Sequence, residues 1–194
     1  MTAVTQKGSD TRAAILDRAV DLASAEGLEG LTIGRLAAEL RMSKSGLFAH
    51  FGSKQELQLA TVAAAAERFR VAVIEPALEL PDGAPRLRAM AERYLEQLQD
   101  YSGGCFFAAA SVEYDDRPGP VRDAIAASLD AWLGALERQA QIAGVENPDR
   151  FAFELYSLAM GANSRYRLSG EREVFGYARE AIDRLLAELP GAIG

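Results

Sequence analysis

The chain has 194 residues, 49% of them hydrophobic and 25% charged, with 28 Asp and Glu against 21 Lys and Arg. The net charge of −7 argues against a general nucleic-acid coat protein and a polybasic membrane binder, because the summed field would repel both partners. A single cysteine excludes an internal disulfide and multi-cysteine zinc sites, and no apolar run reaches the roughly 20 residues that span a bilayer. We therefore expect a cytoplasmic protein without a cofactor or a membrane partner.

The N-terminal end is expected to be a flexible arm over residues 1–9. A first helix is predicted to begin at a Ser9 or Asp10 cap and to run to about Ala25. The segment "EGLEG" would end it. Four apolar residues have the spacing of one buried helical face: Ile15, Ala19, Leu22 and Ala23.

Two short helices across a tight turn are predicted next. Thr32 has the position of a cap for the second helix, and Ser43 has the same position for a third helix that ends at about His50. Ser53 and Glu56 then have the spacing of a capping box at the start of a fourth helix, which we expect to end at about Ile74.

The rest of the chain also shows helical periodicity, after a proline-containing loop that includes Pro76. The breaks "SGG", "DDRPGP", "GVENP" and "SGE" separate the remaining predicted helices. The fold class is therefore all-α with about nine helices. The predicted ranges in this part are 84–101, 104–114, 119–143, 148–168 and 172–189.

One stretch, residues 41–55 with the sequence "RMSKSGLFAHFGSKQ", contains no carboxylate although the chain as a whole is acidic. Residues 1–60 carry seven Lys and Arg and seven Asp and Glu, whereas residues 61–194 carry 14 against 21. The acidic excess thus lies entirely in the second part. A local basic stretch of this kind indicates an anionic partner, although taken alone it is also typical of a solvated surface.

The sequence "GLEGLTIGRLAAELRMSKSGLFAHFGSKQEL" resembles the N-terminal DNA-binding domain of TetR-family transcriptional repressors. The resemblance implies a three-helix helix-turn-helix domain at 10–56, a helical ligand-sensing and dimerisation domain at 57–194, and a third helix that enters the DNA major groove. It also implies a palindromic double-stranded operator bound by a homodimer. The candidate DNA-binding residues are Thr32, Ser43, Lys44, Ser45, Gly46, Phe48, His50 and Lys54.

The residue types in this list suit contact with a polyanion. Ser43, Lys44, Ser45 and Gly46 form a helix start with little side-chain bulk, where backbone N–H groups approach phosphate. Lys44 is the first choice for a phosphate contact. Phe48 stands where the resemblance implies a tyrosine, so a phenolic contact is missing there. His50, the only histidine, is either a phosphate contact or a packed residue.

The last two predicted helices are candidates for a subunit interface. Their apolar stripes are wide enough to face both the core of one subunit and a second copy, which would give a four-helix bundle. The alternative is a helix buried in a single core. The candidate interface residues are Leu155, Ala159, Ala162, Ile182 and Leu186.

The middle helices are the candidate sensor for an unidentified small-molecule effector. Cys105, Ala109 and Glu113 recur at helical spacing, which places a carboxylate on a face of small side chains. The alternatives are that the aromatic residues are plain core and that Glu113 is solvated or paired with Arg117. The candidate ligand-binding residues are Tyr94, Cys105, Phe106, Ala109, Glu113 and Trp132.

Catalysis is not expected, because the sequence has no nucleophile elbow and no phosphate-binding glycine loop. The function predicted from these features is a sequence-specific repressor whose operator binding a small molecule relieves. The alternative is a helical small-molecule-binding protein that kept the motif and lost operator recognition.

Overall fold

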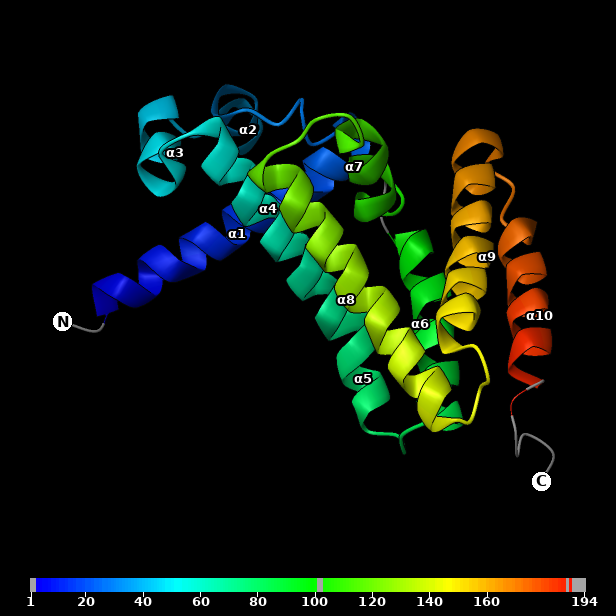
Figure 1. The fold of residues 1–194 in the computed structure, drawn as a ribbon. Coiled ribbons are helices and arrows are strands. Elements are labelled where there is room, and N and C mark those ends of the chain that lie inside the picture. The colour runs from blue at the N-terminus through cyan, green and yellow to red at the C-terminus, as the bar shows by residue number, and fades with distance from the viewer. Residues whose placement is uncertain (1–2, 101–102, 188, 190–194) are drawn as a thin grey trace. The chain divides into compact units, whose positions relative to one another are not determined.

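A computed structural model describes residues 3–100, 103–187 and 189, with side chains from residue 11 onward except that of residue 100. Over these residues the chain forms helices and no strand, as the all-α prediction requires (Figure 1). None of the described helices is long and apolar enough to cross a membrane. The elements are α1 (Ala3–Glu26), α2 (Ile33–Leu40), α3 (Lys44–Phe51), α4 (Lys54–Phe69), the π-helical turn η1 (Arg70–Ile74), α5 (Glu75–Leu78), α6 (Ala84–Asp100), α7 (Phe106–Tyr114), α8 (Pro120–Ile142), α9 (Pro148–Ser169) and α10 (Glu173–Ala187).

Helix α1 begins earlier than predicted. Its backbone is helical from Ala3, so the predicted helix start at a Ser9 or Asp10 cap is wrong, and residues 1–2 lie outside the described part of the chain. Ser9 and Asp10 are interior helical positions rather than caps. A glycine such as Gly8 costs about 1 kcal/mol inside a helix but does not end it, and no proline interrupts this segment.

The fourth predicted helix continues past its expected end. Helix α4 runs through η1 directly into α5, so residues 54–78 form one continuous helical segment that includes Pro76. In η1 the N–H of Glu75 donates to the carbonyl of Arg70, one residue farther back than in an α-helix. This wider turn changes the hydrogen-bond register just before Pro76, which has no N–H to donate, so the proline is accommodated instead of ending the helix.

The chain divides into two compact units that do not follow the predicted boundary at 56/57. Unit 1 contains residues 1–67 and 101–126, and unit 2 contains residues 68–100 and 127–194. Helix α7 and the start of α8 therefore belong with the N-terminal helices. The reason is packing, because Phe106, Ala110 and Tyr114 of α7 join the same buried cluster as the apolar face of α1.

The core of unit 1 forms around the predicted face of α1. Its four residues, Ile15, Ala19, Leu22 and Ala23, are all buried. Leu47 and Phe51 of α3 are buried in the same cluster, which fixes α3 against the domain and leaves its other face outside. Unit 1 thus presents α3 on a rigid support.

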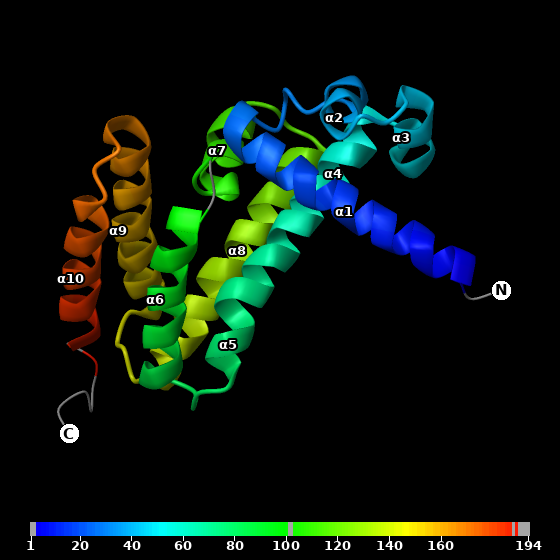
Figure 2. The same cartoon turned by 180° about the vertical axis from the view of Figure 1, so that it is seen from behind.

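Unit 2 is a helical bundle in which α9 and α10 run antiparallel side by side (Figure 2). Helix α9 begins at Pro148, as expected for a residue that lacks an N–H, and Gly170 ends it in the left-handed conformation with φ 75°. The predicted bounds of these two helices agree with the structure to within two residues. Within unit 2, α6 packs against both helices.

Candidate nucleic-acid interface

The two short helices α2 and α3 are built by the caps that the sequence predicts. The Thr32 hydroxyl accepts a hydrogen bond from Arg35 N at 3.0 Å, and the Ser43 hydroxyl accepts one from Gly46 N at 3.0 Å. Between the helices, Arg41 adopts a left-handed conformation with φ 54°, and its N–H donates back to the carbonyls of the last turn of α2. These local bonds fix the tight turn that sets α3 against α2.

The outer face of α3 is exposed over its whole length. Lys44, Ser45 and Phe48 lie on it, and Phe48 is 56% exposed. Gly46 and His50 are half-buried, and the His50 ring packs against Phe51 with centroids 6.2 Å apart. An exposed face of small, cationic and aromatic side chains on a short helix suits insertion into a groove.

Lys44 lies close to the start of α2. Its Nζ atom is 3.7 Å from the place that a Cβ on Gly34 would occupy, and Thr32 Oγ1 is 3.9 Å from the same place. A side chain at position 34 would fill this space. The ammonium group and the cap hydroxyl therefore lie close together at the start of α2, where an anionic oxygen would find more than one donor.

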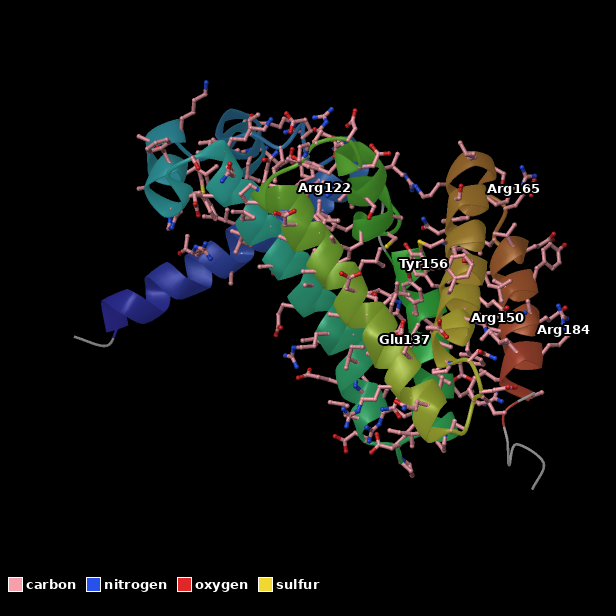
Figure 3. The ribbon with its side chains drawn as sticks, viewed as in Figure 1. Arg122, Glu137, Arg150, Tyr156, Arg165 and Arg184 are labelled. Atoms are coloured by element: carbon pink, nitrogen blue, oxygen red, sulfur yellow. The ribbon has the colours of Figure 1, made fainter. Side chains whose placement is uncertain are left out.

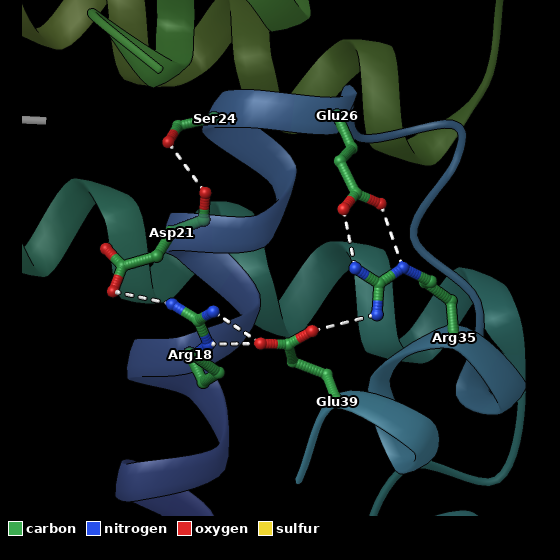
Figure 4. Close-up of polar contacts among 6 residues, drawn as sticks. All are labelled: Arg18, Asp21, Ser24, Glu26, Arg35 and Glu39. Atoms are coloured by element: carbon green, nitrogen blue, oxygen red, sulfur yellow. Dashed lines mark hydrogen bonds and ion pairs between the residues drawn. The ribbon is translucent and has the colours of Figure 1, made fainter. Parts of the chain in front are cut away.

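Most of the other cations of unit 1 are neutralised by carboxylates. Arg18 pairs with Glu39, and Arg35 pairs with Glu39 at 3.0 Å and with Glu26, which ties α1 to α2 (Figure 4). The hydrogen bond from Arg35 lowers the pKa of Glu26, and those from Arg18 and Arg35 lower the pKa of Glu39. Within the described part of residues 1–60, Lys44 has no carboxylate at ion-pairing distance.

Lys54, unlike Lys44, has a carboxylate partner. Its Nζ donates to Glu29 Oε1 at 2.6 Å, and Glu29 Oε2 accepts from Tyr114 Oη at 3.0 Å and lies 3.6 Å from Arg117 NH1. The hydrogen bond from Lys54 is the main cause that lowers the pKa of Glu29. Burial and the bond to Glu29 raise the pKa of Tyr114.

Glu29 is not among the candidate residues from the sequence. Its partners lie 25 and 85 residues away along the chain, and no local pattern indicates them. The loop around it is also bonded through its backbone, since Leu28 N donates to Glu113 Oε2 at 2.7 Å and Leu28 O accepts from Gln58 Nε2 at 2.9 Å. The α1–α2 loop is thus the place in unit 1 where α4 and α7 are both attached.

The six candidate ligand-binding residues do not lie in one unit. Tyr94 and Trp132 pack with Phe69 in unit 2, with ring centroids 4.8–5.6 Å apart. The other four belong to α7 or its start in unit 1, where the carboxylate of Glu113 accepts from the α1–α2 loop. The remaining members of that group are Cys105, which is half-buried at the α7 N-cap position, Phe106, which is buried, and Ala109, which is exposed.

The predicted small-residue face of α7 is therefore not its buried face. Ala109 and Val112 are exposed, whereas Phe106, Ala110 and Tyr114 are buried. Both faces have helical spacing, and the face that carries the large rings is buried because it removes more apolar area from water. The side chain of Ala109 therefore lies at the surface, and its role in ligand binding stays a prediction. Trp132 has a separate feature, since its Nε1 is the one buried side-chain polar atom without a hydrogen-bond partner among those the structure describes.

The five candidate interface residues lie inside unit 2. Leu155, Ala159, Ala162, Ile182 and Leu186 are all buried in the single chain. In this structure they pack within the single chain, and their place in a subunit interface stays a prediction. The outer face of α9 carries a different set at helical spacing, all exposed, namely Phe153, Ser157, Gly161, Ser164 and Leu168.

Two stretches of the sequence match known families. Residues 15–61 match the bacterial regulatory proteins of the tetR family. Residues 83–182, which make up more than half of the chain, match the tetracyclin repressor-like C-terminal domain. Among curated proteins, none matches the sequence of this chain at a significant level.

Several solved structures have the same fold. A TetR-family transcriptional regulator from Streptomyces coelicolor is 25% identical with a TM-score of 0.81, and the match covers 97% of this chain and 96% of that one. A TetR transcriptional regulator from Chloroflexus aurantiacus J-10-FL is 22% identical with a TM-score of 0.81, covering 95% and 98%. AibR, crystallised in complex with isovaleryl coenzyme A and operator DNA, is 22% identical with a TM-score of 0.70, covering 92% and 97%.

Proposed function

Because the chain belongs to the TetR family of bacterial regulatory proteins, it is a DNA-binding transcriptional regulator and not an enzyme, and we propose that it is a repressor released from its operator by a small molecule. The observation that carries the DNA part is the surroundings of Lys44. This cation projects from an exposed recognition helix, lacks a carboxylate partner and lies beside the first turn of α2. A phosphate oxygen would accept hydrogen bonds from these donors.

The proposed binding mode assigns different tasks to the residues of α3. Lys44 and the capped start of α2 at Thr32 hold phosphates and fix the register, while Ser45 and Phe48 face base edges in the major groove. An exposed phenyl ring suits contact with a thymine methyl group better than contact with phosphate. His50, half-buried against Phe51, orients the end of the helix.

The test of this mode is Lys44→Ala, measured on DNA selected from a randomised duplex pool by the wild-type protein. A lost phosphate contact weakens binding to selected and random DNA alike and reduces the slope of log K against log salt by about 0.9. Arg179→Ala, which removes an exposed cation of α10, is the matched control and is expected to leave the slope unchanged.

Two outcomes of this test contradict the proposal in different ways. An unchanged slope for Lys44→Ala removes Lys44 from the interface. Failure of the wild-type protein to select any sequence at about 150 mM salt favours the alternative, a helical small-molecule-binding protein without operator recognition.

A homodimer on a palindromic operator is part of the same proposal. One recognition helix reads a half-site, and two such helices read successive major grooves when they lie about 34–36 Å apart. The outer face of α9 supports this assembly, because Phe153 and Leu168 are 65% and 86% exposed in the single chain. Figure 3 shows Arg184 extending from α10 on the side away from α9.

The effector site is proposed in unit 2 near Trp132. A buried indole N–H without an acceptor costs about 1–3 kcal/mol, and a ligand that brings a carbonyl or ether oxygen would remove this cost. AibR was crystallised with a small-molecule acyl thioester, isovaleryl coenzyme A, together with operator DNA. Coupling of about 1–3 kcal/mol between effector and operator would change DNA affinity by a factor of about 5–150.

A further inference from the structure

Lys54 is a candidate DNA contact that already has an anionic partner in this structure. Its Nζ lies 2.6 Å from Glu29 Oε1, which is the distance of a charge-assisted hydrogen bond. Both side chains are about two-fifths exposed, so the pair lies at the surface and not in the core. A DNA phosphate that approaches Lys54 must therefore displace a carboxylate or share the ammonium group with it.

The carboxylate is also held in place from its other side. Glu29 Oε2 accepts a hydrogen bond from Tyr114 Oη at 3.0 Å and faces Arg117 NH1 at 3.6 Å. The backbone of the preceding residue is fixed as well, because Leu28 N donates to Glu113 and Leu28 O accepts from Gln58. Glu29 is thus positioned toward Lys54 by α4, α7 and the turn after α7, and its side chain loses little additional freedom when it forms the pair.

The bond from Lys54, together with that from Tyr114, lowers the pKa of Glu29, so the carboxylate is charged at neutral pH. Lys54 lies in the first turn of α4, where a positive charge is unfavourable for the helix dipole, and Glu56 is the acidic residue of the same turn. Glu29 is the anion that pairs directly with Lys54. The carboxylate therefore takes the place that a phosphate would take on DNA.

We propose that Glu29 is an intramolecular competitor of the DNA backbone, which limits the affinity of the repressor for all DNA by occupying Lys54. The inference rests on the proposed DNA-binding function and adds a residue that weakens that function. As a consequence, the protein would bind random DNA less tightly than a variant in which Glu29 carries no charge. Tyr114 and Arg117 are positioning residues in this device, because they contact Oε2 of the competing carboxylate while Lys54 binds its Oε1.

The test compares Glu29→Gln with wild type on a random-sequence duplex and on duplex selected by the wild-type protein. The amide keeps an acceptor for Tyr114 but removes the charge that competes for Lys54. Since exposed ion pairs contribute at most about 1 kcal/mol, we expect two- to fivefold tighter binding to both duplexes. The salt slope should become steeper by up to about 0.9, as for one additional phosphate contact.

Two further variants separate this effect from a general loss of negative charge. Asp116→Asn removes an equally charged side chain that is 85% exposed and lies near Arg117, and it should leave the salt slope unchanged. In a Lys54→Gln background the gain from Glu29→Gln should disappear, because no cation is left to release. A gain that persists in this background, or one that Asp116→Asn reproduces, overturns the inference.

The remaining outcomes are also decisive. If Glu29→Gln binds DNA equally or more weakly while wild type binds, Glu29 is only a structural tie of the α1–α2 loop, and the proposal is wrong. A lower melting temperature together with weaker binding points to the same conclusion. If the wild-type protein binds neither duplex, the DNA-binding function fails and the competitor role fails with it.

Discussion

Lys44 and Lys54 carry the same charge in the same unit, but their surroundings give them different roles. Among the side chains that the structure describes, Lys44 of α3 has no carboxylate at ion-pairing distance, whereas Lys54 is paired with Glu29. A cation without a carboxylate partner contributes its full attraction to phosphate. A paired cation contributes only the difference between its attraction to phosphate and its attraction to the carboxylate that it must leave. The number of basic residues in residues 41–55 therefore overestimates the number of cations that are available to DNA.

At the same scale, Trp132 gives a direct prediction about the effector. It is the single tryptophan of the chain and is 6% exposed, so its fluorescence reports on the proposed site alone. Its N–H lacks an acceptor, and aromatic ketones are a suitable first probe because they combine a ring with one acceptor oxygen. We expect compounds selected by thermal shift to change the Trp132 emission.

The matched variant is Trp132→Phe, which keeps an aromatic ring and removes the donor. The same compounds should bind it about 2- to 10-fold more weakly, as expected for one lost hydrogen bond of about 0.5–1.5 kcal/mol. Binding is measured by calorimetry, since the fluorophore is absent from the variant. Equal affinities for wild type and variant would show that the ligand does not contact the indole N–H.

At the scale of elements, the contact of the segment before α7 with α1 depends on a glycine. A Cβ at Gly103 would overlap the carbonyl oxygen of Ser24, which is backbone and cannot move aside. We predict that Gly103→Ala lowers the free energy of unfolding by about 3 kcal/mol, measured as a lower urea midpoint.

The control for this variant is another glycine in a helix. A Cβ at Gly134 of α8 would meet no atom within 4 Å, and alanine in a helix interior is favoured by about 1 kcal/mol. Gly134→Ala should therefore raise the urea midpoint. If both variants behave alike, Gly103 does not pack against α1 as described.

The helices that the sequence predicts well are those whose ends are determined locally. Thr32 and Ser43 cap their helices through bonds to residues three positions away, so the chain itself carries the signal. The start of α1 and the passage through Pro76 escape prediction for the opposite reason. The start of α1 is missed because the helix tolerates a glycine, and the passage through Pro76 is missed because a π-helical turn accommodates the proline. Neither outcome depends on a local stop signal.

The candidate sites follow the same division. The exposed face of α3 follows from helical spacing once Leu47 and Phe51 are recognised as core. Spacing does not decide between the two apolar faces of α7, nor between the inner and outer faces of α9, because both faces carry residues that can be buried. The Glu29 junction depends on pairs 25 and 85 residues apart, which a single sequence does not indicate.

At the scale of the whole molecule, the acidic excess lies outside the part of the chain that carries the DNA-binding helices. Residues 1–60 are balanced, and the net charge of −7 comes from residues 61–194. An acidic body repels DNA everywhere except at the local cationic surface, which favours one docking orientation. A dimer would double this asymmetry and present two such surfaces to one operator.

The assembly itself gives the last prediction, which concerns a two-fold axis at the middle of α9. The exposed residues Phe153, Ser157, Gly161, Ser164 and Leu168 are arranged nearly symmetrically about position 160–161. If two copies of α9 cross antiparallel there, Phe153 meets the partner's Leu168, and small residues allow close approach at the centre. Bulk at Gly161 would separate the two helices.

Gly161→Leu should therefore convert the proposed dimer to a monomer in sedimentation experiments at micromolar concentration. A Cβ at Gly161 meets no atom within 4 Å in the single chain, so the variant is expected to fold. Gly134→Leu, at an equally open glycine of α8, is the control and should stay dimeric. Because one half-site contact is much weaker than two, the monomer should lose most of its affinity for the palindrome while its binding to random DNA changes less. A Gly161→Leu protein that sediments as a dimer would place the interface on another face of unit 2.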